Sequence, residues 1–479
     1  MITPTSAYGN KYVTAPNIDR IAHDGALLLN NFVANSICGP SRATLLTGKY
    51  SHKNGYMLNE RTFDVYQETF PVLLQKNGYQ TAWIGKLHLG SLPIGFDYFN
   101  ILPGQGQYYN PDFINNHNDT VRYKGYVTNL ISDFFFSWLG QRDTSKPLFA
   151  VVGEKATHRE WLPDIQDLGA YDNINFLLPA TFYDAYAERL AAKDQDMMID
   201  KTMQLKEDLK VHVGFYQQPD NQLYSPYARF DEGQKKAYND YYENRISKDF
   251  DEKKLTGKDL VEWKFQRYLK DYYATAKSLD HNIGRLLDYL DSTGLAKNTV
   301  VIYTSDQGFY LGEHGWFDKR FIYDESLLTA FLVRYPGVIK PGIKVDALIS
   351  NVDWAPTILD IAHTPVPAEI QGKSFLPLLQ EKKRPDWRQD VYYHYYEYPQ
   401  PHHVSSHFGI RTKDYVLVRF YKGVDRWELF DLKKDPNELH NLHGYKKYAP
   451  IEQDLKNHLK KQILLYDDQE ALQQFNKSL

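Results

Sequence analysis

The chain has 479 residues, of which 24% are charged and 42% hydrophobic, and its formal net charge is -4. That length and composition are typical of a soluble globular protein with one large core and room for a smaller domain. The slight negative charge gives no general electrostatic case for binding nucleic acid, so a polyanionic partner would need a local basic pocket. Because Cys38 is the only cysteine, an intrachain disulfide is excluded.

The sequence carries no obvious membrane or export signal. No run approaches the roughly 20 apolar residues of a membrane helix, so we expect no membrane span. Residues 1–6 lack the basic and apolar regions of a signal peptide. Three alternatives follow: the chain is cytoplasmic, already processed, or incomplete at its start.

Short apolar runs alternate with helix-like segments over most of the first 360 residues, which predicts an α/β fold. The run at 148–152 is apolar throughout, as is typical of a buried strand, and 299–304 resembles it. A glycine stop predicts that a helix ends near 73–78. The expected strands are 79–84, 148–152, 299–304 and 330–335.

The middle of the chain is predicted to be helical. Leucine and isoleucine side chains that share one helical face predict a long helix over 259–290. The stretch before it, about 190–258, is charged and contains tyrosines, with little strand character. We interpret it as an insertion of solvated helices and loops over the core.

The composition changes near residue 380, where a charged segment that contains Pro-Asp is typical of a linker. Beyond it, β-rich runs at 391–396 and 415–421 and a helix near 450–466 predict a small antiparallel sheet with a helix on it. We therefore predict a large domain over 1–380 and a C-terminal α+β subdomain over 381–479.

Helix start and stop signals bracket the cysteine. Pro40 suits the first turn of a helix and Gly48 its C-terminal stop. Cys38 would then lie at a helix N-terminus, where backbone N–H groups favour an anion. Arg42, one turn later, is suited to grip a tetrahedral oxyanion at the same place. The residues predict an anion site that contains a reactive group; the alternative is a merely buried cysteine near a helix cap.

The order Cys38-x-Pro40-x-Arg42, followed by Leu-Thr-Gly, resembles the signature of type I sulfatases. The resemblance implies an alkaline-phosphatase-like mixed sheet flanked by helices, with a smaller C-terminal antiparallel sheet plus helix. It also implies that a maturation enzyme oxidises Cys38 to formylglycine. One hydroxyl of the hydrated aldehyde attacks sulfur, and the other later expels sulfate, a step that a thiol cannot perform.

Further motifs match the same family. Lys86 and His88 follow a strand directly, and residues i and i+2 of an extended chain point the same way. The resemblance implies that Lys86 contacts sulfate and that His88 takes a proton from the formylglycine hydroxyl. His158 matches a sulfate contact and candidate acid for the leaving alcohol, although Thr157 stands where the family often has proline.

A predicted metal site follows the strand at 299–304. Asp306 and Gln307 would lie at its carboxyl end, where open α/β sheets place ligands, and their oxygens suit Ca²⁺. The resemblance implies that these two residues and the modified Cys38 hold the metal. It also implies that Lys319 binds sulfate on the leaving-group side, as the alternative acid.

The family normally has an apolar strand ending in Asp-Asp shortly before the segment that matches residues 6–10, and both aspartates are metal ligands. Asp19 and Asp24 come too late to match them. We expect either that the natural protein starts upstream, with a signal peptide, this strand and the aspartate pair, or that the chain is a sulfatase remnant with too few oxygen ligands for tight Ca²⁺ binding.

The closest resemblance is to bacterial N-acetylglucosamine-6-O-sulfatases that act on heparan-type or mucin glycans, through segments 304–320, 392–399 and 407–411. It implies a sulfated glycan substrate, a formylglycine-generating maturation enzyme as partner, and a periplasmic or extracellular location. The predicted substrate-binding residues are His402, His407, Arg411 and His314.

Several alternatives remain open at this point. The four substrate candidates would otherwise decorate a sheet edge or, for His314, serve turn geometry. The chain could be another carbohydrate sulfatase, such as one specific for iduronate or galactose sulfate, or an inactive remnant that only binds sulfated glycan. A phosphatase or phosphodiesterase of the same superfamily is a further alternative, and the Cys-x-Pro-x-Arg order argues against it.

Overall fold

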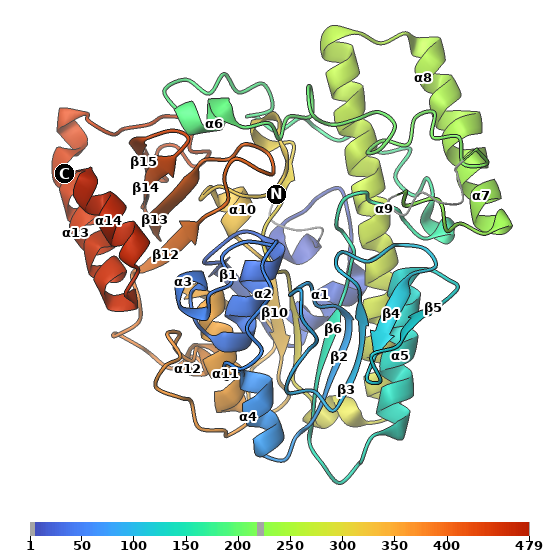
Figure 1. The fold of residues 1–479 in the computed structure, drawn as a ribbon, viewed down its shortest axis with the longest axis horizontal. Helices are drawn as coiled ribbons and strands as arrows, with labels where there is room; N and C mark the ends of the chain where they lie inside the picture. The colour runs from blue at the N-terminus through green and yellow to red at the C-terminus, as the bar shows by residue number, and fades with distance from the viewer. Residues whose placement is uncertain (1–4, 218–224, 479) are drawn as a thin grey trace.

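The computed structural model describes residues 5–217 and 225–478. They form an α/β body with a C-terminal antiparallel sheet packed on one side of it (Figure 1). The predicted fold class is confirmed, because mixed sheets flanked by helices are joined by a smaller antiparallel sheet with helices. Within these two ranges, no helix is both long enough and apolar enough to cross a membrane.

The first sheet of the body contains, in spatial order, β11 (Ile343–Ser350), β1 (Ala26–Phe32), β10 (Phe331–Arg334) and β7 (Val301–Thr304). β1 pairs in parallel with β11 and antiparallel with β10, so the sheet is mixed. Because successive side chains of a strand point to opposite faces, Ala26 and Leu28 join the core on one side and Leu27 joins the core on the other.

The second sheet contains, in spatial order, β5 (Thr120–Arg122), β4 (Asp112–Asn115), β3 (Tyr98–Leu102), β2 (Gln80–Lys86) and β6 (Leu148–Gly153). β2 is parallel to both of its neighbours, whereas β4 pairs antiparallel with β3 and β5. Side chains again alternate: Ala82 and Ile84 face one core and Trp83 faces another.

Helices cover both faces of these sheets. α1 (Pro16–His23) and α9 (Gly257–Ser292) pack on the Leu27 side of the first sheet, and α5 (Val127–Gln141) packs on the Ala82 side of the second. α11 (Trp354–Ile361) and α4 (Phe70–Lys76) cover the opposite faces. The long helix predicted over 259–290 is therefore confirmed as α9.

Two strands expected to be buried are only half-buried. Every residue of β7, and Leu148 to Val152 of β6, is partly exposed. Each strand lies at the end of its sheet in the described residues, so it has a neighbouring strand on one side only. Apolar composition identified the strands correctly, but it did not reveal their position in the sheet.

The stretch from about 190 to 258 contains, among its described residues, α6 (Leu190–Asp194), α7 (Glu232–Tyr238), a π-helical segment (Asn239–Ser247) and α8 (Lys248–Lys253). α7 and α8 lie beside one end of α9 (Figure 1). The prediction of solvated helices and loops is wrong in part, because Phe215, Phe230 and Tyr242 are buried in one core with Tyr109 of the body.

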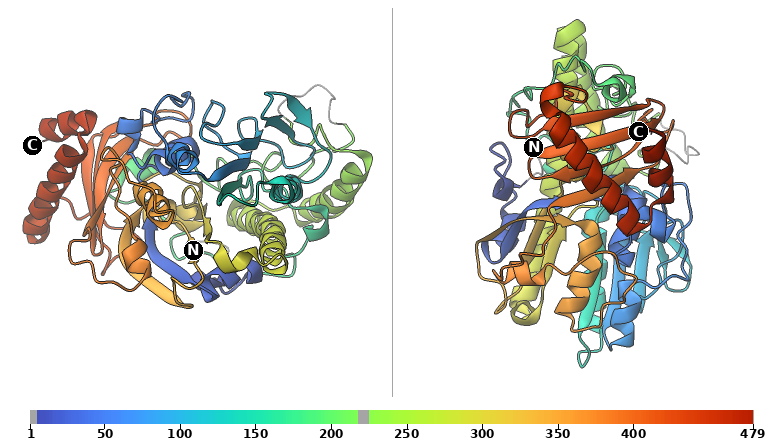
Figure 2. Two further views of the ribbon diagram at one scale, coloured as in Figure 1. Left: turned by 90° about the horizontal axis from the view of Figure 1, so that it is seen from below. Right: turned by 90° about the vertical axis from the view of Figure 1, so that its left-hand side faces the viewer.

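The C-terminal sheet contains, in order, β12 (Asp390–Tyr395), β13 (Ser406–Thr412), β14 (Tyr415–Lys422) and β15 (Arg426–Asp431). α13 (Ala449–Tyr466) and α14 (Gln469–Lys477) cover one of its faces, as Figure 2 shows. Its other face packs on the body through a shared core that includes Phe321, Tyr393 and Phe420. β12, β14 and α13 were predicted; β13, β15 and α14 were not.

A buried ion pair ties the approach to β12 to the body. Nη2 of Arg388 donates to Oδ1 of Asp353 at 2.7 Å, and Nη1 bonds the other carboxylate oxygen. The Asp353 side chain is 0% exposed and also accepts hydrogen bonds from the backbone N–H groups of Ser350 and Lys373. The pair therefore fixes both the start of α11 and the segment that leads into the C-terminal sheet.

We expect Arg388→Met to lower the free energy of unfolding by about 3–5 kcal/mol, because it leaves the Asp353 carboxylate buried without its cation. Urea denaturation measures the change. Arg384→Met, which removes an exposed pair with Asp386, is the control and should leave stability nearly unchanged. Equal urea midpoints for the two variants would contradict a stabilising role for the buried Arg388–Asp353 pair.

Candidate active site

The cysteine lies on α2 (Cys38–Thr47), whose predicted start and stop are confirmed. Gly48 ends the helix in the left-handed region, with φ 63°. Cys38 is the first helical residue and is only 1% exposed. Gly39 is also required there, since a Cβ at that position would lie 2.5 Å from a ring carbon of Tyr56. The thiol is thus held at the buried N-terminus of a helix, as the sequence predicted.

Buried positive charge surrounds the thiol. Lys86 and Lys319 are 2% and 4% exposed. Burial raises the pKa of the Cys38 thiol, but the charges of Lys319 and Lys86 outweigh it. Together with the neighbouring imidazoles of His158 and His88, they hold that pKa well below its usual range. The pocket therefore favours an anion at the position of the sulfur atom.

Arg42 lies one turn further along α2 and is fixed at two points. Its Nε donates to Oδ2 of Asp306 at 2.9 Å, and its Nη1 donates to the backbone oxygen of Lys86 at 2.7 Å. Asp306 follows β7 and Lys86 ends β2, so the carboxyl ends of strands from both sheets meet at this helix. The structure thus brings together the residues that the sequence predicted for one pocket.

Asp306 and Gln307 have the right chemistry for a metal but do not complete a site. Nε2 of Gln307 lies 3.9 Å from the Cys38 sulfur, and its Oε1 is buried without a hydrogen-bond partner. Within residues 5–217 and 225–478, no group of three or more His, Cys, Asp or Glu residues could hold a metal ion. Ca²⁺ takes six to eight oxygen ligands, so Asp306 and Gln307 could provide only part of a calcium site.

Lys86 and His88 reach the pocket by a different backbone path from the one predicted. β2 ends at Lys86, and His88 adopts the left-handed region with φ 58°. The expectation that an extended chain points both side chains the same way is therefore wrong. The turn after the strand brings the imidazole back toward Cys38, where it helps to lower the thiol pKa.

The orientation of His158 is fixed by backbone groups. Its Nδ1 lies 2.7 Å from the backbone oxygen of Arg159, which can only accept a hydrogen bond, so Nδ1 carries the proton. Burial, with the charges of Lys86 and Lys319, lowers the pKa of His158 to about 3. His158 is therefore neutral in the free protein, and the negative charge of a bound sulfate ester would be needed to raise its pKa.

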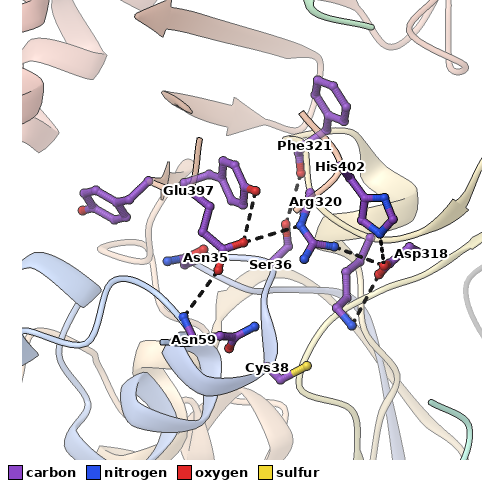
Figure 3. A network of polar contacts seen from close by, with 12 residues as sticks. Asn35, Ser36, Cys38, Asn59, Asp318, Arg320, Phe321, Glu397 and His402 are labelled. Atoms are coloured by element: carbon purple, nitrogen blue, oxygen red, sulfur yellow. Dashed lines mark hydrogen bonds and ion pairs between the residues drawn. The ribbon is translucent and has the colours of Figure 1, made fainter. Parts of the chain in front are cut away.

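A cavity of about 310 Å³ opens above Cys38, and the C-terminal part of the chain contributes one wall. His402 lines it: Nε2 lies 2.9 Å from Asp318 and Nδ1 lies 3.1 Å from Asp196. Figure 3 shows Asp318 between His402 and Arg320. Nζ of Lys319 lies 3.4 Å from the same carboxylate. Of the four substrate-binding residues predicted, His402 is the one placed at the cavity.

The other three predicted substrate residues lie in the core, and their assignment is corrected. His314 is 0% exposed, with Nδ1 2.8 Å from Asp184 and a left-handed φ of 57°. His407 is also 0% exposed; its Nδ1 bonds the Ser405 backbone oxygen at 2.8 Å, and burial lowers its pKa to about 3. Arg411 pairs with Asp324 at 2.8 Å. Each of the three is buried and bonded to a neighbour in the core, and none of these side chains lines the cavity.

Some cavity residues were missed by the sequence reasoning. Asp318 and Arg320 flank Lys319 in the chain, so their position beside a predicted site residue was a usable signal. Asn59, Gln105 and Glu397 line the cavity from distant segments, and of these only Glu397 lies in a segment, 392–399, that carries the family resemblance. Oδ1 of Asn59 accepts the backbone N–H of Gly39 at 2.9 Å and so supports the helix N-terminus below the thiol.

A mixed-sheet α/β body whose strand ends and a helix N-terminus enclose a buried cysteine among cations has the alkaline-phosphatase-like fold. A phosphonate monoester hydrolase from Silicibacter pomeroyi has the same fold, with a TM-score of 0.73, 19% identity and coverage of 98% of this chain and 95% of that one. The model of the sulfatase family matches residues 4–364, and a model described as "N-sulphoglucosamine sulphohydrolase, C-terminal" matches 312–464. The chain therefore belongs to the sulfatase family and is a sulfuric ester hydrolase.

Among its relatives, an N-acetylglucosamine-6-O-sulfatase from Bacteroides thetaiotaomicron is 46% identical over 471 residues, 97% of this chain and 84% of that protein. The human N-acetylglucosamine-6-sulfatase is 26% identical, over 78% of this chain and 62% of its own length. A solved structure of a protein in complex with its substrate, D-glucosamine-2-N,6-O-disulfate, has a TM-score of 0.94 and 44% identity, over 97% of this chain and 96% of that one.

Proposed function

We propose that this enzyme removes the 6-O-sulfate of glucosamine residues, N-acetylated or N-sulfated, in heparan-type or mucin glycans. The observation that carries the proposal is that one cavity contains both a pocket for sulfate and a polar wall for a sugar. A cation-lined pocket at Cys38 fits a sulfate group, and the wall formed by Asp318, Arg320 and His402 offers polar groups to sugar hydroxyls. The relatives that share 44–46% identity act on sulfated glucosamines.

Cys38 is proposed to act after conversion to formylglycine, which the family generally uses together with Ca²⁺. A hydrated formylglycine at position 38 supplies one hydroxyl that attacks sulfur, breaking the S–O bond to the sugar, and a second whose deprotonation re-forms the aldehyde and expels sulfate. Arg42, Lys86 and Lys319 would bind the sulfate oxygens and stabilise the charge that develops on them. Asp306, Gln307 and the oxygen at position 38 would provide part of a calcium site.

Besides the proton that the attacking hydroxyl loses as its oxygen bonds sulfur, two protons must move in this scheme. The departing sugar oxygen needs one, and His158 or Lys319, which both line the cavity, would donate it. His158 is neutral in the free protein, so in this role it depends on the bound sulfate to raise its pKa. His88 would take the second proton, from the hydroxyl that remains at position 38, which allows sulfate to leave.

The test is desulfation by the full chain, produced together with a formylglycine-generating enzyme. Sulfate release from N-acetylglucosamine-6-sulfate and glucosamine-2-N,6-O-disulfate should exceed release from 2-sulfated iduronate and 6-sulfated galactose at least about tenfold in kcat/KM. Preference for either of the latter would overturn the substrate assignment. Glycan binding without sulfate release would favour the alternative of an inactive, glycan-binding protein. Mass spectrometry of the Cys38 peptide reports the conversion.

We also propose a periplasmic or extracellular location, in keeping with glycans as substrates and with the bacterial relatives. Cell fractionation with an antibody against the chain tests it: signal in the periplasmic, outer-membrane or medium fraction supports the proposal. Retention with cytoplasmic markers would overturn it.

His402→Ala is expected to raise KM for the sulfated sugar about tenfold, with kcat changed less than about threefold. His402 holds the Asp318 carboxylate at the cavity, and the loss corresponds to roughly 1.4 kcal/mol, the scale of one hydrogen bond from that wall made equally in ground and transition states. Steady-state kinetics measures both constants. His403→Ala is the matched control, because His403 pairs with Asp194 and does not line the cavity. An unchanged KM in His402→Ala would remove this residue from the sugar site.

A further inference from the structure

A glutamine that no sequence motif marks lies against one of the proposed catalytic histidines. Nε2 of Gln105 is 3.0 Å from Nε2 of His88, and Gln105 lines the same cavity as Cys38. The amide oxygen of Gln105, Oε1, is buried without a hydrogen-bond partner. Nδ1 of His88 is likewise buried without a partner among the described residues. Among the described residues, Gln105 is thus the side chain that forms a hydrogen bond with the His88 ring.

A neutral imidazole has one N–H donor and one lone-pair acceptor. The hydrogen-bond partner of Nε2 therefore determines whether Nδ1 carries the proton or the lone pair. When the amide nitrogen of Gln105 donates to Nε2, Nδ1 carries the proton. A half-turn of the amide group brings Oε1 to Nε2 instead. That orientation gives the orphaned oxygen a donor and leaves a lone pair on Nδ1. His88 needs this second state to accept a proton.

The segment that carries Gln105 is itself held against the active site. Nζ of Lys155 lies 3.4 Å from the backbone oxygen of Gln105 and 4.7 Å from the centre of the Tyr108 ring. The Tyr108 hydroxyl donates to the backbone oxygen of His158 at 2.6 Å. One short stretch, 105–108, therefore contacts the ring of His88 and the backbone of His158, which is the arrangement expected of groups that orient catalytic side chains.

We propose that Gln105 is a positioning residue for His88: during turnover its amide oxygen accepts a hydrogen bond from Nε2–H, so that Nδ1 faces position 38 as a base. The inference rests on the proposed function, in which His88 takes the proton from the remaining hydroxyl before sulfate leaves. Gln105 itself touches neither the substrate nor the reacting atoms in this scheme. It acts by fixing the ring and its tautomer.

The kinetic test compares Gln105→Leu with Gln105→Glu in the full, matured chain, using N-acetylglucosamine-6-sulfate. Leucine removes the hydrogen bond, and we expect kcat to fall about 10–100-fold with KM changed less than about twofold. Glutamate keeps an acceptor for Nε2–H, so kcat should stay within about threefold of wild type. Gln141→Leu, an exposed glutamine on α5, is the matched control.

Because sulfate release is the step that is slowed, Gln105→Leu should release sugar in a burst of about one equivalent, followed by a slower steady rate. Equal losses in the Leu and Glu variants would indicate a merely structural role and overturn the proposal. So would an unchanged kcat in Gln105→Leu. A wild-type chain that releases no sulfate from any sulfated sugar would instead contradict the proposed function.

An NMR measurement that needs no turnover tests the positioning role of Gln105 separately from the proposed function. In protein labelled with ¹⁵N-histidine, with the His88 signals assigned by comparison with His88→Ala, wild type and Gln105→Glu should each hold one imidazole tautomer. Gln105→Leu should populate both. Identical His88 spectra in wild type and Gln105→Leu would overturn the positioning role whatever the activity of the enzyme.

Discussion

Cys38→Ala is expected to abolish sulfate release, with kcat reduced at least about 10⁴-fold. The nucleophile and both hydroxyls of the proposed scheme come from this one side chain, and removing a nucleophile usually costs most of the rate that an enzyme provides. Steady-state assays with N-acetylglucosamine-6-sulfate measure the loss. The variant should fold normally, since alanine suits a helix and the thiol leaves only a small space.

The unmodified wild-type chain is the control that separates the residue from its modification. Produced without a maturation enzyme, it keeps the Cys38 thiol, and it should be as inactive as Cys38→Ala. Mass spectrometry distinguishes thiol from aldehyde in the same peptide. Full activity in a sample that contains only the thiol would contradict the formylglycine mechanism, and activity in Cys38→Ala would place the nucleophile elsewhere.

Lys319→Met is expected to lower kcat/KM about 10²–10³-fold, the usual cost of removing one preorganised charge from a transition-state site. Burial lowers the pKa of this lysine, but the charges of Asp318 and Cys38 outweigh that effect and raise it. Lys319 is therefore charged at neutral pH and available to bind sulfate. Methionine keeps an unbranched side chain of nearly the same length and removes the ammonium group with its charge and its N–H donors.

Lys264→Met is the matched control for this variant. Lys264 is also buried, at 8% exposure, but its Nζ donates to the backbone oxygens of Asp200 and Met203, and it does not line the cavity. It should lose stability while keeping kcat/KM near the wild-type value. Similar kinetic losses in both variants would show that removing any buried lysine impairs the enzyme, and would contradict a specific role for Lys319.

Much of the fold was predictable because its signals are local. Apolar runs located β2, β6, β7 and β10, and helical periodicity located α9. β13 and β15 were missed because their strands depend on neighbours: Gly409 of β13 pairs with Tyr393 and Val418, and charged Arg426 and Glu428 begin β15. A strand whose sequence is mixed is defined by the ladder it completes rather than by its own pattern.

The residues of the active site also differ in how far the sequence predicts them. The cysteine, its helix and Arg42 were determined by the sequence alone, because Cys38, Pro40, Arg42 and Gly48 lie within a few turns and each has a local physical reason. Lys86, His158, Asp306 and Lys319 were recognised from short motifs, and the structure brings them around the same thiol.

Only the tertiary structure decided which polar residues face the cavity. His402, His407 and Arg411 lie within ten residues of one another, yet His402 reaches the pocket while the other two are buried in the core. Gln105 carries no sequence signal at all, because its position beside His88 is set by a loop from another part of the chain. The reason is that a side chain's chemistry is fixed by its type, whereas its partners, exposure and protonation are fixed by the segments that fold against it.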